Sequence, residues 1–186
     1  MKKVGALLIV MILLTGCSRG DPGMERALAL RGKLLRASGC SFDTKITADY
    51  GDKLYEFSLD CEADAQGNLT FSVLQPESIA GITGNIRDSG GNLTFEDVAL
   101  HFDLMAEDQL SPVSAPWIFL KTLRSGYITS TAEEEGSLRL SVDDSFDDDA
   151  LRLDIWLGED SLPYRAEILH DGRRILSLSI TNFALL

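Results

Sequence analysis

The chain has few of the residues that carry out enzyme chemistry. It contains two histidines, His101 and His170, and it has no G-x-S-x-G, P-loop or G-x-G-x-x-G pattern. Each histidine falls on an expected strand, with neither a cysteine nor a second histidine at metal-ligand spacing, so both are interpreted as structural. The sequence therefore predicts a protein that is not an enzyme and that has no cofactor and no metal site.

Basic residues are also scarce. Seventeen lysines and arginines stand against 29 aspartates and glutamates, which gives a formal net charge of −12. A nucleic-acid-binding surface needs clustered positive charge, and anionic headgroups repel an acidic protein. The composition therefore argues against nucleic acid and against docking to anionic lipid by charge. Solubility is the simplest role for such an acidic surface.

No apolar run is long enough to cross a membrane. The longest, Val4–Leu14, is preceded by Lys2 and Lys3, and its last residue begins the pattern Leu14-Thr15-Gly16-Cys17. A transmembrane helix takes about 20 residues, so this layout is that of a cleaved signal peptide instead. The L-T-G-C pattern resembles the lipobox of bacterial lipoproteins. The resemblance implies that Cys17 is acylated, with palmitate among its chains, and becomes the first residue of the mature protein. An ordinary secretory signal that leaves a cysteine is the alternative.

These signals divide the chain into three parts. Residues 1–16 are the signal peptide, residues 17–20 a lipidated tether, and residues 21–186 a single domain large enough for a hydrophobic core. The mature protein is expected outside the cytoplasm, anchored by lipid to a bacterial membrane. Ser18 follows the anchor, instead of the aspartate that retains some Gram-negative lipoproteins at the inner membrane. The expected address is therefore the outer membrane in a Gram-negative host and the outer face of the cell membrane otherwise.

The remaining cysteines, Cys40 and Cys61, form an even pair in an oxidising compartment, which predicts a disulfide. Two expected strands, 40–49 and 52–61, flank Tyr50-Gly51, a plausible two-residue turn. This turn pairs residues whose numbers sum to 101, so Cys40 faces Cys61 and one face of the hairpin is mostly apolar. Two free buried thiols and a metal pair are the alternatives.

Helix signals occur at two places. Asp21-Pro22 has an N-cap residue before a proline, and apolar residues follow at helical spacing until Gly39 ends the segment. A second helix is expected over Ser114–Arg124. Its Trp117–Leu120 segment is apolar nearly all round, so this helix is expected to be buried.

Most of the remaining chain shows the alternation of apolar and polar residues that is typical of strands. The strands expected after the first hairpin are 69–74, 83–87, 92–97, 99–103, 127–131, 138–142, 151–157, 164–170 and 173–183. Asp171-Gly172 is a strong hairpin signal between the last two. The predicted fold class is α+β, mostly antiparallel β, with the strands in one meander.

One acidic stretch, Asp143–Asp149, offers carboxylate oxygens to calcium. It lacks the glycine and the closing glutamate of an EF-hand loop. A solvated hairpin loop is therefore the preferred interpretation.

Three stretches carry a resemblance to a known family. They are Gln75-Pro76-Glu77 with Ile79-Ala80-Gly81-Ile82, Ser111-Pro112 through the Trp117 helix, and Pro163–Ile168 with Asp171-Gly172 and Ile180–Phe183. They are similar to segments of the outer-membrane lipoprotein carriers, the LolA/LolB-like proteins, whose fold GerS-like germination lipoproteins share. The resemblance implies a curved half-barrel sheet, with the N-terminal helix and the mid-chain helix covering its concave face. The chain departs from the soluble carrier in its own lipobox and in the Cys40–Cys61 pair.

The resemblance also implies an apolar concave face that shelters acyl chains. The candidate lining residues are Leu69, Phe71, Val73, Trp117, Leu120, Leu153, Ile155 and Leu157. The first hypothesis is thus a membrane-anchored protein that binds a lipid or lipoprotein acyl chain. The alternative is a non-enzymatic envelope interaction or assembly protein, for instance in spore germination, in which the same residues form a filled core. The expected partners are the membrane, a lipid and an envelope protein, and not nucleic acid.

Overall fold

The computed structural model describes residues 21–51, 53–88, 90–95, 98–103, 105–106, 109–147 and 150–186. The predicted signal peptide, the predicted anchor Cys17 and the tether lie outside the described residues. Within the described ranges, no helix has the length and apolar character needed to cross a membrane.

Both predicted helices are confirmed. α2 spans Pro22–Arg36, and α3 spans Ala115–Ser125. The carboxylate of Asp21 caps α2: it accepts a hydrogen bond from the Gly23 amide at 2.9 Å and one from the Thr131 hydroxyl at 2.5 Å. The bond from Thr131, followed by that from Gly23, lowers the pKa of Asp21. The cap therefore fixes the start of α2 against a distant strand.

In the part of the chain that the structure describes, eleven strands form one antiparallel sheet, and a two-stranded ribbon stands apart from it. The strands of the sheet are β1 (Gly39–Asp49), β2 (Leu54–Asp64), β3 (Leu69–Gln75), β4 (Thr83–Arg87), β5 (Gly90–Phe95), β6 (Val98–Phe102), β9 (Tyr127–Glu134), β10 (Ser137–Asp143), β11 (Arg152–Leu157), β12 (Pro163–His170) and β13 (Arg173–Leu185). The ribbon comprises β7 (Met105–Ala106) and β8 (Gln109–Leu110). The predicted class, mostly antiparallel β with two helices, is confirmed.

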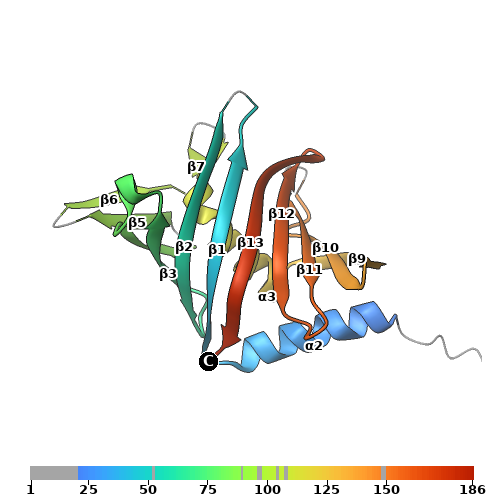
Figure 1. Cartoon of the computed structure of the whole chain (residues 1–186). Coiled ribbons are helices and arrows are strands. Elements are labelled where there is room, and N and C mark those ends of the chain that lie inside the picture. Colours follow the sequence, from blue (N-terminus) through green and yellow to red (C-terminus); the bar gives the residue numbers. More distant parts are fainter. Residues whose placement is uncertain are drawn as a thin grey trace, which may run out of the picture.

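The strands do not form the single meander that the sequence predicted. Their order is β6-β5-β4-β3-β2-β1-β13-β12-β11-β10-β9, so the first and last strands of the chain pair at the centre. α3 precedes β9, which lies at the opposite edge from β6. Figure 1 shows the result: the upright central strands are flanked by β5 and β6, which run across the view, and α2 lies along one end of the sheet. Two meanders are thus joined by the β1–β13 pairing.

The predicted register of the first hairpin is wrong. Cys40 pairs with Ala63, and Phe42 pairs with Cys61. The strands are joined by residues 50–53 rather than by a two-residue turn, and the Tyr50 amide donates to the Lys53 carbonyl at 3.0 Å. Each residue of β1 pairs with a residue of β2 two positions later than predicted, so paired residue numbers sum to 103 instead of 101. Because side chains alternate with a period of two, the same residues still face the core.

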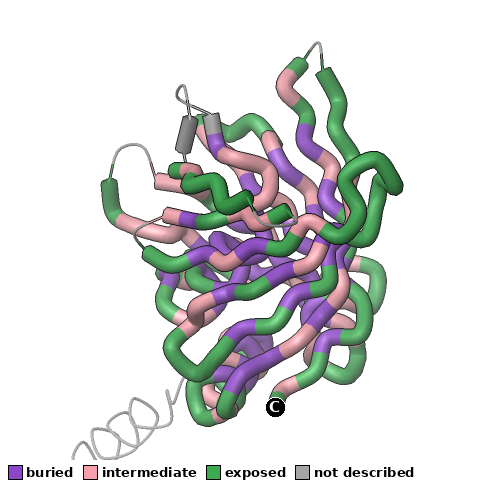
Figure 2. The backbone as a smooth tube through the Cα atoms, turned by 90° about the vertical axis from the view of Figure 1, so that its left-hand side faces the viewer, coloured by how far each residue is buried: buried purple, intermediate pink, exposed green. Residues whose placement is uncertain are grey.

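The hydrophobic core lies between the curved sheet and α3. Buried and less buried residues alternate along the strands (Figure 2), and the buried apolar residues form one cluster. α3 has its main sheet contacts with β10, β12 and β13, and α2 packs on α3 and β9. The Arg31 guanidinium donates to the Leu123 carbonyl at 2.8 Å, which ties α2 to the C-terminal turn of α3. The helices thus cover the C-terminal half of the sheet most fully.

Candidate functional site

Cys40 and Cys61 are free, buried thiols in the structure. The observed register makes them diagonal neighbours on one face of the β1–β2 pair. Such neighbours lie about 7–8 Å apart, whereas a disulfide joins Cα atoms at about 4.4–6.8 Å. The predicted disulfide is therefore absent from the structure, because the pairing that would have placed the cysteines opposite each other does not form. Burial raises the pKa of Cys40 to about 11 and also raises the pKa of Cys61.

The eight apolar residues proposed to line a ligand site come together in one cluster. They come from β3, α3 and β11, and each is at most 5% exposed: Leu69, Phe71, Val73, Trp117, Leu120, Leu153, Ile155 and Leu157. The three from β11 are completely buried. All eight side chains are therefore buried within the single hydrophobic core cluster.

The apolar inner face extends beyond this core onto β5 and β6. The register places Phe71 beside Gly84, Gly84 beside Leu93, and Leu93 beside Leu100, so all four belong to the inner face. Phe95 and Val98 form the next pair on that face.

The inner face is open to solvent at this end. Phe95 is 49%, Val98 61% and Leu100 62% exposed, and Leu93 is partly buried against the core. We refer to Leu93, Phe95, Val98 and Leu100 as the exposed wing. Soluble proteins seldom leave adjacent large apolar side chains uncovered without a binding partner. The exposed wing is therefore the best candidate for an apolar binding surface among the described residues.

Two glycines shape the wing. A Cβ on Gly84 would lie 2.7 Å from Cε1 of Phe71 and 2.9 Å from the Asn92 carbonyl oxygen, and a Cβ on Gly91 would overlap the Phe102 ring. Each glycine therefore lets an aromatic ring of the neighbouring strand lie over the glycine backbone. Glycine in a strand interior marks such close approaches and tight bends. These positions accompany the change in strand direction between β3 and β6 that Figure 1 shows.

The sequence prediction missed the wing, although the signal was present. Leu93 and Phe95 alternate with polar residues in β5, and Leu100 and Phe102 do so in β6. Alternation marks one apolar face on each strand, but it does not say whether a helix covers that face. Only the position of α3 shows which apolar strands remain open.

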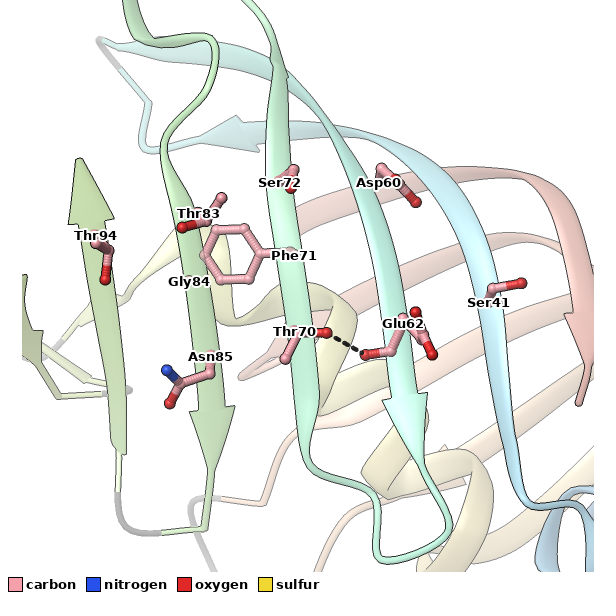
Figure 3. Close-up of a pocket in the computed structure, with 10 residues that line it drawn as sticks. All are labelled: Ser41, Asp60, Glu62, Thr70, Phe71, Ser72, Thr83, Gly84, Asn85 and Thr94. Carbon is pink, nitrogen blue, oxygen red and sulfur yellow. Dashed lines mark hydrogen bonds between the residues drawn. The ribbon is translucent and has the colours of Figure 1, made fainter. Parts of the chain in front are cut away.

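The outer face of the same strands is polar. A shallow hollow of about 390 Å³ is lined mainly by hydroxyl, amide and carboxylate groups (Figure 3), including Asp60, Glu62, Thr70 and Asn85. The Thr70 hydroxyl donates to the Glu62 carbonyl at 3.2 Å. A ligand site for an apolar molecule needs mostly apolar walls, which this hollow lacks.

The other candidates for chemistry stay isolated. Among the described residues, no group of three or more histidine, cysteine, aspartate or glutamate side chains is arranged to hold a metal ion. In the acidic stretch proposed as a calcium loop, Asp143 pairs with Arg152 at 3.0 Å, and the Asp144 carboxylate accepts from the Leu151 amide at 2.8 Å. These two carboxylates stabilise the β10–β11 connection.

Comparison with known proteins finds similarity in structure only. No family model matches the chain, and no curated protein matches its sequence. A LolA superfamily protein from Nitrosomonas europaea is similar over 86% of this chain and 93% of its own length, at 10% identity and a TM-score of 0.49. The lipoprotein LppX of Mycobacterium tuberculosis is similar over 87% and 92%, at 12% identity and a TM-score of 0.41. LprF of Mycobacterium bovis is similar over 87% and 92%, at 11% identity and a TM-score of 0.42. The solved structures that resemble this chain thus include a LolA superfamily protein and a lipoprotein.

Proposed function

We propose that this protein is a membrane-anchored extracytoplasmic lipoprotein that binds a lipid or lipoprotein acyl chain on the inner face of its half-barrel. Cys17 is the proposed anchor, and residues 21–186 form the proposed binding domain. The proposal includes no catalytic step. The proposed binding surface is the exposed wing rather than the eight buried residues that the sequence suggested.

The carrying observation is the continuity of the apolar inner face from the core to the sheet edge. Phe71 and Leu93 lie in or against the core, and Leu100, beside Leu93, is 62% exposed. An acyl chain that lies along this face removes apolar area of both the acyl chain and the protein from water. Burial contributes about 25 cal/mol per Å² of apolar surface, which needs no charge complementarity and suits an acidic protein.

The test is a titration of the mature chain, carrying Cys17→Ser, with a fluorescent fatty acid or phospholipid. Leu100→Lys places a charge on the exposed wing and should weaken binding by about tenfold or more. Leu54→Lys is the matched control, because Leu54 is a strand leucine that is 65% exposed away from the wing. It should leave binding unchanged. Saturable binding that both variants weaken equally, or no binding at all, contradicts the proposal.

A second candidate function is an envelope interaction or assembly protein with a filled core. The observation that favours it is the complete burial of Leu153, Ile155 and Leu157 with α3 over the sheet. In that case the exposed wing contacts protein rather than lipid. Failure of lipid binding, together with loss of a stable envelope partner in Leu100→Lys, would support this function.

A further inference from the structure

The two helices differ in charge from the rest of the protein. Of the 29 acidic residues in the chain, only Glu25 lies in α2 or α3, whereas six basic residues lie there. The six are Arg26, Arg31, Lys33, Arg36, Lys121 and Arg124. Positive charge is thus concentrated in the two helices of a protein whose formal net charge is −12. The net charge of the whole protein therefore does not decide whether the two helices attract an anion.

α2 is also apolar on the side that it turns to solvent. Leu28 is 52% and Leu35 is 53% exposed, and they lie two turns apart on one face of the helix. Gly32 lies between them and adds no side chain. A helix that combines outward leucines with lysine and arginine has the composition of helices that lie in a membrane interface.

A hollow of about 300 Å³ lies where Leu35 of α2, one side of α3, residues 66–68 and Asp88 come together. Leu35 and Trp117 supply apolar lining, and Lys121 and Arg124 supply positive charge. The Lys121 ammonium lies 4.7 Å from the centre of the Trp117 ring. Its nearest described carboxylate, that of Asp88 at 3.5 Å, is 87% exposed, and such exposed pairs contribute little. Arg124 Nη2 donates to the Ala65 carbonyl at 2.7 Å, and the remaining N–H groups of Arg124, like the Lys121 ammonium, can still donate to an anion beside apolar surface.

The position of Cys17 favours a bilayer as the occupant. Cys17 is four residues before Asp21, the N-cap of α2. Four residues span at most about 14 Å when fully extended. A lipid on Cys17 would thus hold the start of α2 close to the headgroups of the bilayer. The exposed leucines of α2 would then be near the membrane surface.

We propose that this helical face, comprising Leu28, Leu35, Arg36, Lys121 and Arg124, docks on the surface of an anionic phospholipid bilayer. The leucines enter the interface, and a headgroup phosphate occupies the hollow between Lys121 and Arg124. The cations draw the face to anionic lipid, and the leucines add burial that salt does not screen. This surface is separate from the exposed wing, so the inference holds whether or not the wing binds an acyl chain.

The test is flotation of the mature chain, carrying Cys17→Ser, with vesicles. The protein should bind phosphatidylcholine vesicles containing about one third phosphatidylglycerol about tenfold more tightly than vesicles of phosphatidylcholine alone. Arg36→Glu with Lys121→Glu should lower that binding about tenfold or more. Lys45→Glu with Arg173→Glu makes the same change in net charge on exposed sheet residues, and it should leave binding unchanged.

Thermal unfolding of both double variants checks that they fold, and Leu35→Gln provides a variant without charge change that should also weaken binding. Equal loss in the two double variants would attribute binding to net charge and overturn the proposal. Equal binding to both kinds of vesicle would overturn it as well. Displacement by inorganic phosphate beyond that caused by chloride of equal ionic strength would show a site for free phosphate instead of a bilayer-docking face.

Discussion

Two threonine hydroxyls are buried in the core without a hydrogen-bond partner among the described residues. Thr44 lies on the inner face of β1, and Thr122 lies in α3. A buried, unpaired polar group costs about 1–3 kcal/mol of stability. Ser114 provides the contrast, because its buried hydroxyl donates to the Ser111 carbonyl at 2.6 Å. The same chemical group thus has opposite effects at two places in one core.

Thr44→Val replaces the unpaired hydroxyl with a methyl group of similar size. We expect the free energy of unfolding to stay unchanged or to rise by about 1 kcal/mol, because the desolvation cost disappears. Ser114→Ala should lower it by about 1 kcal/mol, because a buried hydrogen bond is lost. Urea unfolding of both variants measures the difference. A loss in Thr44→Val as large as that in Ser114→Ala would show that the Thr44 hydroxyl is paired after all.

The buried thiols give a prediction about pH. Burial raises the pKa of Cys40 from 9.0 to about 11, and it raises the pKa of Cys61 as well. In the unfolded chain both thiols ionise near their ordinary value, whereas in the folded chain they remain neutral. The contribution of the neutral thiols to the free energy of unfolding should therefore be complete below about pH 9, and it should be lost as the pH rises towards 11. Cys40→Ala with Cys61→Ala should flatten this fall.

Alkylation tests the same state of the cysteines directly. At pH 8 the folded mature chain, carrying Cys17→Ser, should react slowly, because the thiolate is the reactive form and both thiols are buried. After unfolding without a reductant, two thiols should react per chain. Unfolded chains that react only after reduction would show a disulfide, contrary to the register in the structure.

At the scale of elements, β4 depends on a glycine that faces an aromatic ring. Gly84→Ala would place its Cβ 2.9 Å from the Asn92 carbonyl oxygen and against the Phe71 ring. Overpacking of this kind costs about 1–3 kcal/mol. We expect the melting temperature to fall and the wing to lose order, as measured by calorimetry and amide exchange.

The same substitution in α2 should have the opposite sign. A Cβ on Gly32 would meet only the flexible Arg36 guanidinium, at 3.3 Å or more. Alanine is favoured over glycine in a helix by about 1 kcal/mol. Gly32→Ala should therefore raise the melting temperature. If Gly84→Ala were also neutral or stabilising, the contact between Phe71 and the β4 backbone would not be as close as the structure places it.

Elements whose signals are local could be predicted from the sequence. The Asp21 cap and Pro22 place the start of α2 correctly, and Asp171 and Gly172 both have positive φ in the turn between β12 and β13. The register of β1 and β2 could not be predicted in this way. A change from a two-residue to a four-residue connection leaves Phe42 and Ile46 on the same face, so the alternation of apolar residues fits either pairing.

The candidate site needed information that strand patterns do not contain. Phe71 and Phe95 both lie at apolar positions of alternating strands, yet one is 3% and the other 49% exposed. The difference comes from the long-range packing of the chain, which places Phe71 in the core cluster and leaves Phe95 outside it. The pairing of Cys40 with Leu185 at the sheet centre likewise joins residues that are far apart in the sequence. Local patterns thus predicted which residues face inward but not which of them are covered.

At the scale of the whole molecule, the inner face of the sheet is buried in the core over most of its strands and exposed at β5 and β6. α2 and α3 have their main contacts on the C-terminal side of the β1–β13 pairing. Among the described residues, β6 is an edge strand that pairs in the sheet with β5 alone. Regions with few buried contacts open locally at lower cost than the core does. The β5–β6 edge should therefore be the part that responds to a ligand.

Hydrogen exchange should distinguish the β5–β6 edge from the core strands. Amides of β5 and β6 should exchange at least about tenfold faster than those of β12 and β13, because strands at an uncovered edge open without unfolding the core. If the exposed wing binds an acyl chain, adding a fatty acid should slow exchange in residues 90–95 and 98–102 and leave the core strands nearly unchanged. Leu100→Lys should abolish that slowing, and Leu54→Lys should keep it. Protection that appears around Leu153, Ile155 and Leu157 instead would place the ligand beneath α3, where the sequence first suggested it. Uniform rates across the sheet, with or without lipid, would mean that the wing is as firmly held as the core and has no separate binding role.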